Sequence, residues 1–503
     1  MKGFFYKLLL ILALTLAWPV LLSSCTQKSA KNRGDALSHH VIITYMTVGN
    51  RPTNGATEKM LKELNKILTE KVNAELQIFY IPWNDYLVNY NMCLAQLDGA
   101  VDLVGTASDW LDAWNNVKNG TFLGMSDEMV QKYAPKTYES VTPEHWEMCR
   151  MNGKLYMLPE DNFAQWINHG FIYRSDWAKE AGFANGVHSW EELTTYLEYV
   201  AKNKPGVTPW NSDGAVSTYH PEGYIESKSD YVPLEGISTN LYFGVHRQNL
   251  SKVYSPFIEG NELVEYAKLM RRWKLMGVWP ENVFQNKSEN REEFKKGKTG
   301  IEQHHTQTWY TEVRPALQAN VPGADSEFFW FGEESGNITA MTITHGAMAV
   351  SAASPNPERA LMVYDLLRND SECYRLINYG IEGVQYQLTG NGYREAPAGY
   401  DSDTQKITTN YWWGRNDNLE VRDKSGAWDK FEEKNAIYGQ HKIDYPYPKI
   451  VWDISSITQE LAELNNLWGI YMGNICYGTK DDPEAYVLEF RQECKRAGIE
   501  KVI

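Results

Sequence analysis

The chain has 503 residues, enough for two or three domains or for one large two-lobed body. Its hydrophobic content of 43% and charged content of 22% are typical of a folded globular protein. A formal net charge of -15 argues against nucleic acid or anionic lipid as the main partner, because both attract clustered lysine and arginine. Aromatic residues make up 13% of the chain, so many side chains are available for stacking on a ligand.

The first 24 residues have the pattern of a secretory signal. Two lysines precede an uncharged apolar run over residues 8–22, which is short for a membrane span of about 20 residues. The sequence Leu-Ser-Ser directly before Cys25 resembles a bacterial lipobox. This resemblance implies cleavage before Cys25, acylation of that cysteine and attachment of the mature protein to a membrane. Residues 25–40 then form a polar tether. The alternative is an ordinary signal in which Cys25 is incidental.

Alternating strand and helix patterns follow the tether. Strands are predicted at residues 41–46, 76–82 and 101–104, and amphipathic helices at residues 57–68 and 85–97. This β-α-β-α-β order predicts a parallel sheet with helices on its faces. In such a sheet, ligands bind beyond the carboxyl ends of the strands.

The same α/β pattern continues along the chain. A strand is predicted at residues 171–174, and Ser189 with Glu192 forms a capping-box pattern at the start of a helix. The remaining strongly predicted helices cover residues 262–276, 357–367, 455–468 and 483–496. Taken together, these elements predict a large α/β protein.

Several short segments occur in an order that resembles one family. They are Val101–Val104 before a polar loop, Gly153–Tyr156 before a proline, Tyr173-Arg174 before a helix, the helix start Ser189–Glu192, Lys296–Gly300 ahead of Trp309, and Ala349–Pro355. In this order they resemble the extracellular solute-binding proteins of bacterial ABC importers, in the group that includes maltose-binding protein. The later segments Ile377–Val384 and Trp412–Gly414 resemble a branch with an extended C-terminal region.

The resemblance implies an α/β protein with two lobes, the type II-like periplasmic-binding-protein fold, joined by crossing segments that serve as a hinge. The crossings are expected near residues 160–166 and 340–346. The implied domains are lobe 1 at residues 41–162, lobe 2 at 163–340, a return to lobe 1 at 341–400, and a C-terminal extension at 401–503 that packs on the lobes.

The resemblance also nominates ligand-binding residues. In this family the loop after the third strand supplies polar groups, here Ser108, Asp109 and Trp110. A tryptophan downstream of the Lys-Gly-Lys-Thr-Gly turn often stacks on sugar, which nominates Trp309 with Gln307 beside it. Carboxylates and amides bind sugar hydroxyls while tryptophan covers the C–H faces of the ring, so these residue types suit a carbohydrate. Core packing is the alternative role for either tryptophan.

Three further candidates rest on position alone. Asp85 follows the second predicted strand, where an N-cap role is at least as consistent with its place. Trp166 lies near a predicted crossing segment, and Trp413 lies beside Trp412 in a loop-rich region.

Motifs for covalent chemistry or phosphate binding do not occur: there is no G-x-S-x-G, no H-E-x-x-H and no G-x-x-x-x-G-K-[ST]. The adjacent His304 and His305 fit a satisfied or solvent-facing pair better than a metal site, because an extended loop would point the two rings apart. We therefore predict no catalytic residue, no metal and no cofactor. Spacing does not select a disulfide among the cysteines that follow Cys25, which are Cys93, Cys149, Cys373, Cys476 and Cys494.

These observations predict a lipid-anchored extracellular solute-binding protein. It captures a carbohydrate, in particular an oligosaccharide, between its lobes and delivers it to the permease of an ABC importer. It is expected to be a monomer with no nucleic-acid partner. The alternatives are an extracellular glycoside hydrolase with a catalytic carboxylate pair, or a surface module that binds peptides or proteins.

Overall fold

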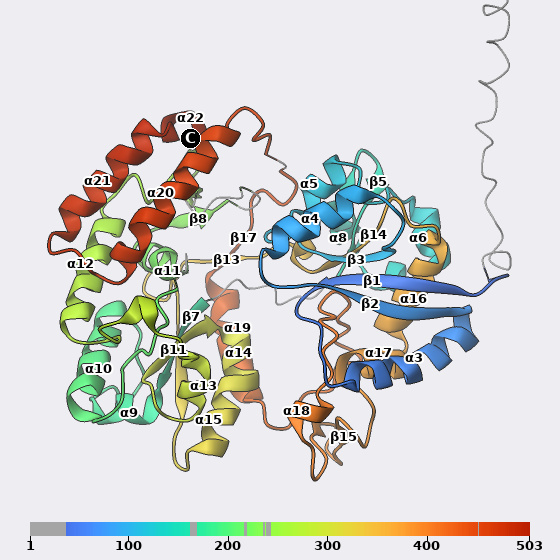
Figure 1. Cartoon of the computed structure of the whole chain (residues 1–503), viewed down its shortest axis with the longest axis horizontal. Helices are drawn as coiled ribbons and strands as arrows, with labels where there is room; N and C mark the ends of the chain where they lie inside the picture. The colour runs from blue at the N-terminus through green and yellow to red at the C-terminus, as the bar shows by residue number, and fades with distance from the viewer. Residues whose placement is uncertain (1–36, 161–168, 216–218, 235–236, 238–242, 451) are drawn as a thin grey trace, which may run out of the picture.

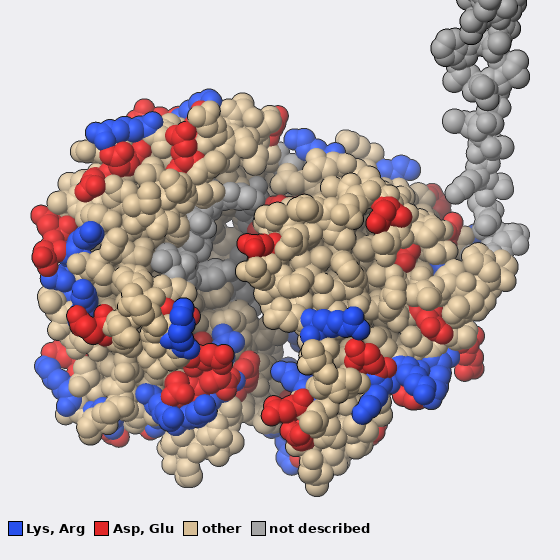
Figure 2. Space-filling view, in the orientation of Figure 1, with Lys and Arg blue, Asp and Glu red and all other residues tan. Residues whose placement is uncertain are grey.

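The computed structural model describes residues 37–160, 169–215, 219–234, 237, 243–450 and 452–503. These residues form two lobes that lie side by side (Figure 1), with a hollow between them (Figure 2). The signal pattern and Cys25 lie outside the described residues. Within the described ranges, no helix combines the length and the apolar character that crossing a membrane requires.

Lobe 1 is built around a five-stranded sheet with the order β2-β1-β3-β14-β6. Its strands are β1 (Val41–Val48), β2 (Ala74–Ile81), β3 (Leu103–Thr106), β6 (Leu158–Pro159) and β14 (Ala347–Val350). The predicted parallel arrangement holds for β1, which pairs in parallel with β2 and β3. β14 pairs antiparallel with both β3 and β6. β1 starts at the outer side of lobe 1 and runs toward lobe 2 (Figure 1), so the carboxyl ends of the three parallel strands face the other lobe.

Helices cover this sheet with their apolar sides. α3 (Ala56–Val72) buries Met60, Leu64 and Leu68, which share one side of the helix because they recur every four residues. The helix ends at Asn73, whose φ of 49° is left-handed and whose N–H bonds the Leu68 carbonyl. The predicted amphipathic pattern therefore becomes one wall of the lobe 1 core.

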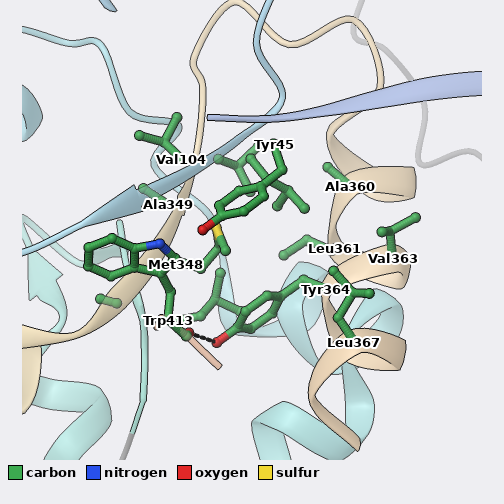
Figure 3. Packing of buried hydrophobic residues seen from close by; sticks show 14 of the residues in the cluster. Tyr45, Val104, Met348, Ala349, Ala360, Leu361, Val363, Tyr364, Leu367 and Trp413 are labelled. Atoms are coloured by element: carbon green, nitrogen blue, oxygen red, sulfur yellow. Dashed lines mark hydrogen bonds between the residues drawn. The ribbon is translucent and has the colours of Figure 1, made fainter. Parts of the chain in front are cut away.

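The core of lobe 1 also contains a helix from much later in the chain. α16 (Pro357–Asn369) packs against α3 and the sheet. Figure 3 shows Leu361 and Tyr364 of this helix among buried side chains from the sheet, including Tyr45 of β1 and Met348 of β14. Lobe 1 is therefore completed only after the chain has returned from lobe 2.

Lobe 2 holds a three-stranded antiparallel sheet with the order β11-β7-β12. Its strands are β7 (His169–Arg174), β11 (Ile301–His305) and β12 (Ser326–Trp330). α10 (Trp190–Asn203) and α12 (Glu262–Leu275) contribute to the core on one face, where Trp190 stacks on Trp273 with ring centroids 6.1 Å apart. β7 is the central strand, and β11 lies at an edge of the sheet.

The predicted cap of α10 is confirmed. The Ser189 hydroxyl accepts a hydrogen bond from the Glu192 N–H at 3.1 Å, which satisfies one of the free donors at the helix start. The Glu192 carboxylate accepts from the His188 N–H at 2.7 Å. In a capping box the Glu192 carboxylate would accept from the N–H of the cap residue Ser189. Here it accepts from the N–H of the preceding residue, His188.

The C-terminal extension is divided between the two lobes. Tyr411 and Trp413 are buried in the core of lobe 1. The helices that follow contribute to the two cores of lobe 2, and they are α19 (Trp428–His441), α20 (Thr458–Cys476), α21 (Pro483–Arg496) and α22 (Ile499–Val502). Apolar side chains of the region expected as a C-terminal extension, residues 401–503, thus pack in the cores of both lobes.

The described chain passes between the lobes in more than one place. One passage leads from β13 (Ile338–Ala340) through η3 (Ile343–His345) to β14. The crossing expected near residues 160–166 falls, apart from Glu160, outside the described residues. A further passage leads from Val421, which packs in a cluster of lobe 1 tyrosines, to Ala427 in lobe 2. Several passages restrict the lobes to motions about a common hinge region.

The five described cysteines are all free thiols, and four of them are buried. No disulfide therefore connects the described elements, and the pairing that the sequence left open does not occur among them.

Candidate functional site

Loops at the carboxyl ends of the lobe 1 strands line the side of this lobe that faces lobe 2. Trp83 lies two residues after β2 ends, and Trp110 lies four residues after β3 ends. Loops that follow neighbouring parallel strands meet at one edge of the sheet, so these two tryptophans are brought together. Trp412 reaches the same place from the loop before Trp413.

These side chains form a cluster that we call the aromatic platform: Trp83, Tyr86, Trp110, Trp412 and Trp413. The ring of Trp83 stacks on that of Trp412, at a centroid distance of 6.1 Å and an interplanar angle of 28°, and on that of Trp110, at 6.2 Å and 21°. The rings of Trp110 and Trp412 are themselves 6.4 Å apart, so the three indoles form a triangle of mutual contacts. Trp83 and Trp412 remain 45% and 42% exposed, although large aromatic residues are usually buried. The platform thus offers two indole rings to a ligand in the hollow.

Trp413 supports the platform from below. It is 1% exposed, and its ring stacks on Trp110 with centroids 5.9 Å apart and an angle of 24°. The Tyr364 hydroxyl donates to the Trp413 carbonyl at 2.7 Å (Figure 3). A Cβ at Gly105 would lie 2.1 Å from the Trp413 indole nitrogen, so glycine at this position of β3 permits the close approach. In this structure Trp413 is a buried support and presents no face to the hollow.

Ser108 and Asp109 connect the loop after β3 to a crossing segment. The Ser108 hydroxyl lies 2.9 Å from Thr342 Oγ1 and accepts from Thr344 Oγ1 at 3.0 Å. Asp109 Oδ2 lies 2.8 Å from His345 Nδ1 in η3. The two polar residues that follow the third strand thus tie the base of the platform to the hinge.

Asp109 favours the protonated form of His345. Burial alone would lower the pKa of His345, but the charge of Asp109 and the hydrogen bond to it outweigh burial and raise the pKa above 6.5. Asp109 Oδ1 is also buried, and among the described residues it has no hydrogen-bond partner. This carboxylate oxygen, in the residue before Trp110, is enclosed in this structure and keeps an unused capacity to accept a hydrogen bond.

Lobe 2 contributes a cluster of imidazoles at the ends of β7 and β11, which we call the histidine cluster: His169, His304 and His305. His169 and His305 are cross-strand partners with ring centroids 5.6 Å apart, and the rings of His304 and His305 are 4.1 Å apart. The expectation that the two adjacent rings point apart is therefore wrong. They sit at the last two positions of a strand that leads directly into α14 (Thr306–Thr308), and the turn brings them together.

Burial keeps these imidazoles uncharged. It lowers the pKa of His304 to about 2 and that of His305 to about 4, with the charge of Arg291 contributing to both. Burial also holds the pKa of His169 well below 6.5. Neutral imidazole both donates and accepts hydrogen bonds, so the cluster suits hydroxyl groups. No group of three or more metal-ligating side chains with suitable geometry occurs in the described ranges.

Trp309 does not lie at the hollow. It is 0% exposed, its indole N–H donates to the Ser326 hydroxyl at 3.1 Å, and its ring stacks on Phe328 at 5.7 Å. The expectation that it stacks on sugar is corrected: in this structure Trp309 packs in the core of lobe 2. The polar residues that precede Trp309 belong to the end of β11 and to α14. Their polarity does not extend to Trp309, which is buried.

The other sequence candidates have different positions. Gln307 is exposed on α14, two residues before Trp309. Asp85 is exposed at the N-cap position of α4 (Tyr86–Gln96), where its side chain accepts from the Asn84 amide at 3.0 Å and makes no capping bond. Trp166 lies outside the described residues.

Sequence reasoning selected Asp85 and left out Trp83, although both follow the same strand. A usable signal was present, because Trp83 is the first aromatic residue after the strand end and the loop around it is otherwise polar. The stacking partner Trp412 lies more than three hundred residues away in the sequence, so periodicity does not connect the two.

The arrangement of lobes and hinge defines the class of the fold. The chain has the two-lobed α/β fold of solute-binding proteins, as predicted. Three solved structures share it. The N-glycan transport solute binding protein NgtS from Streptococcus pneumoniae has a TM-score of 0.72 at 18% identity, covering 92% of this chain and 96% of that protein. Alginate-binding protein AlgQ2 without calcium ion has a TM-score of 0.62 at 16% identity (93% and 97% covered), and maltose-bound T. maritima MalE3 has a TM-score of 0.55 at 15% identity (91% and 99% covered).

Sequence comparisons agree with this class. A curated relative from Streptococcus pneumoniae, a carbohydrate ABC transporter substrate-binding protein, is 22% identical over 490 residues, which cover 94% of this chain and 91% of the relative. Residues 446–503 match a family model described as a domain of unknown function (DUF3502). The predicted resemblance to solute-binding proteins of ABC transporters is thereby confirmed, and the family-model match covers the last helices of lobe 2.

Proposed function

We propose that this protein is an extracellular solute-binding protein that captures a carbohydrate, in particular an oligosaccharide, and delivers it to an ABC importer. The observation that carries the proposal is the aromatic platform, where Trp83 and Trp412 remain more than 40% exposed at the end of lobe 1 that holds the polar loop with Ser108 and Asp109. A sugar ring has apolar C–H faces and hydroxyls at its edge, so it matches stacked indoles next to a hydrogen-bond acceptor.

The proposed mechanism is capture by closure of the lobes. Lobe 1 supplies the aromatic platform and Asp109, and the histidine cluster of lobe 2 supplies neutral donors and acceptors from the opposite side. Rotation about the crossing segments brings the two sets onto the ligand and removes water from the indole faces. The closed form then differs in shape from the open form, which gives a permease a means to distinguish the loaded protein.

The names of the relatives support a carbohydrate over other solutes. The curated relative is named for carbohydrate transport, and NgtS structures carry titles naming complexes with Man1GlcNAc and Man5GlcNAc. This chain spans more than nine-tenths of each of these proteins, so both lobes of the relatives have counterparts here.

The proposal includes a lipid anchor on Cys25 and a protein that acts as a monomer outside the cytoplasm. Metabolic labelling with a radioactive or clickable palmitate analogue tests the anchor. We expect label on the wild-type protein and none on Cys25→Ser, which should move from the membrane fraction to the medium. Equal membrane retention of the two proteins would contradict the anchor.

Calorimetric titration with neutral oligosaccharides tests the binding function. Trp83→Ala and Trp412→Ala should each weaken binding about tenfold, the loss expected when one ring no longer covers a sugar face. Phe79→Ala is the matched control, because Phe79 lies on β2 before Trp83 and is 44% exposed. Unchanged affinity in both tryptophan variants would contradict the platform.

The hydrolase alternative is tested in the same preparation. A binding protein returns the oligosaccharide intact, so prolonged incubation followed by chromatography should show only the starting sugar. Release of shorter products in proportion to time and protein would replace the transport proposal with an enzymatic one.

A further inference from the structure

A polar pocket lies along the free edge of β11 in lobe 2 and adjoins the histidine cluster. Its volume is about 410 Å³, and its walls include Trp210, Tyr477, Gln303, Arg291 and Glu302. The Gln303 amide nitrogen lies 3.0 Å from Nδ1 of His169, which joins the pocket to the cluster. The pocket is thus part of the polar surface that lobe 2 offers, with two aromatic walls and amide and carboxylate groups between them.

Among the described residues that line this pocket, Arg291 is the only lysine or arginine, and its charge is already neutralised. Its Nε donates to Glu302 Oε1 at 3.2 Å, and Glu302 is 6% exposed. The other carboxylate oxygen of Glu302 accepts from the Asn290 amide at 2.5 Å. Two exposed acids, Asp213 and Glu289, also line the pocket without a cation bound to them in the described structure. The pocket therefore has an excess of negative charge.

Basic side chains near the aromatic platform are also paired with carboxylates. His345 faces Asp109, as described above. Arg415, which follows the platform loop, donates from Nε to Asp417 at 2.7 Å, and the charges of Glu420 and Glu160 also act on it. Each of these two basic side chains already has an acidic partner. An incoming anion would have to displace that partner.

We infer that the site selects uncharged oligosaccharides and rejects those that carry carboxylates, such as uronate oligomers. This inference rests on the proposed function and names the substrate class of the same site. A sugar hydroxyl can exchange hydrogen bonds with the neutral imidazoles. A sugar carboxylate would lose its hydration, meet the unpaired acids Asp213 and Glu289, and find no unpaired lysine or arginine among the described residues that line the pocket.

Calorimetric titration of the protein with three ligand sets tests the inference: neutral hexose oligomers, hexuronate oligomers of the same length, and a neutral methyl ester of those uronates. We expect the neutral oligomers to bind and the uronates to bind at least about tenfold more weakly. The methyl ester should recover part of the loss. Raising the salt concentration should reduce the difference in affinity between neutral oligomers and uronates, because screening weakens charge repulsion.

Two variants locate the effect. Glu302→Gln and Asp213→Asn each remove one negative charge from the pocket, and both should narrow the discrimination against uronates. Asp213 is exposed, so its variant is expected to fold normally even if the buried substitution does not. Glu484→Gln is the control, since it changes the net charge by the same amount at a side chain of α21 that is 54% exposed.

The outcomes separate this inference from the proposed function. Uronate binding as tight as or tighter than neutral binding would overturn the inference while leaving carbohydrate capture intact. Discrimination that is unchanged in both pocket variants would also overturn it, because the charges named here would then not cause the selectivity. Absence of binding to every sugar would overturn the proposed function and the inference with it.

Discussion

At the scale of single residues, tryptophans of this chain serve two opposite purposes. Trp309 is fully enclosed, with its N–H satisfied by Ser326, whereas Trp83 stacks on its neighbours and keeps nearly half of its surface open. The same residue type thus stabilises a core in lobe 2 and forms part of the proposed binding surface in lobe 1. The exposed fraction of the side chain distinguishes the two environments.

Replacing Trp309 by alanine is expected to lower the free energy of unfolding by about 3–5 kcal/mol, because the change leaves a large cavity and an unpaired Ser326 hydroxyl. Chemical denaturation measures the loss. Trp83→Ala, at the surface of the platform, should cost about 1 kcal/mol or less.

If Trp309→Ala were as stable as wild type and instead lost sugar affinity, the packing role described above would be wrong. Trp309→Phe gives a second check, since its phenyl ring can still stack on Phe328 while the indole N–H that bonds Ser326 is lost. It should retain more stability than the alanine variant.

At the scale of elements, β11 places uncharged imidazoles at a strand end. The pKa of His304 in the folded protein is about 2 and its ordinary value is 6.5. As the pH falls below 6.5 the unfolded chain takes up a proton that the folded protein does not, so stability is lost on acidification. The free energy of unfolding falls most steeply with decreasing pH between these two pKa values.

The expected result is a fall in the free energy of unfolding on the order of 1 kcal/mol per pH unit below pH 6.5 from this residue. His304→Gln has no such group and should show a shallower dependence between pH 6.5 and pH 5. His39→Gln is the control at an exposed position. Identical slopes in wild type and His304→Gln would contradict the assignment of a neutral buried imidazole.

The C-terminal helices are structural parts of lobe 2. α21 buries Val487 and Phe490 against α12 and α20, in the same core as Trp273. Phe490→Ala should therefore destabilise the protein by about 3–5 kcal/mol. Leu488→Ala, on the same helix but 47% exposed, should change stability by no more than about 0.5 kcal/mol.

Thermal unfolding and limited proteolysis distinguish these outcomes. A Phe490→Ala protein that unfolds at the wild-type temperature would indicate that residues 446–503 form a removable appendage. In that case the region matched by the family model would have to be treated as separate from lobe 2.

At the scale of the whole molecule, the crossing segments allow the lobes to move about a common hinge. A ligand that contacts both lobes favours the closed form by the difference between its affinities for the two forms. Small-angle X-ray scattering should therefore show a smaller radius of gyration when a bound oligosaccharide saturates the protein. Trp83→Ala at the same sugar concentration should show a smaller change, and full compaction of that variant would contradict a role for the platform in closure.

Much of the fold could be predicted from local sequence. The strand at residues 41–46, the helix at 57–68 and the capped helix after Ser189 follow from periodicity and capping, which depend on neighbours within a few residues. The order of segments predicted the two-lobed class. The candidate site was only partly predictable: Trp110 is part of the platform and Asp109 is beside it, whereas Trp309 is buried and Asp85 is exposed at the start of α4 without making a capping bond.

The sequence by itself determined the elements, their parallel order in lobe 1 and the class of the fold, because these depend on local patterns and on the sequence of landmarks. Only the tertiary structure decided which tryptophans are accessible and which charges are already paired. Trp83 and Trp412 meet across more than three hundred residues, and Asp109 meets His345 across more than two hundred. Such contacts depend on how the return strand and the late loop pack, and no local pattern encodes that packing.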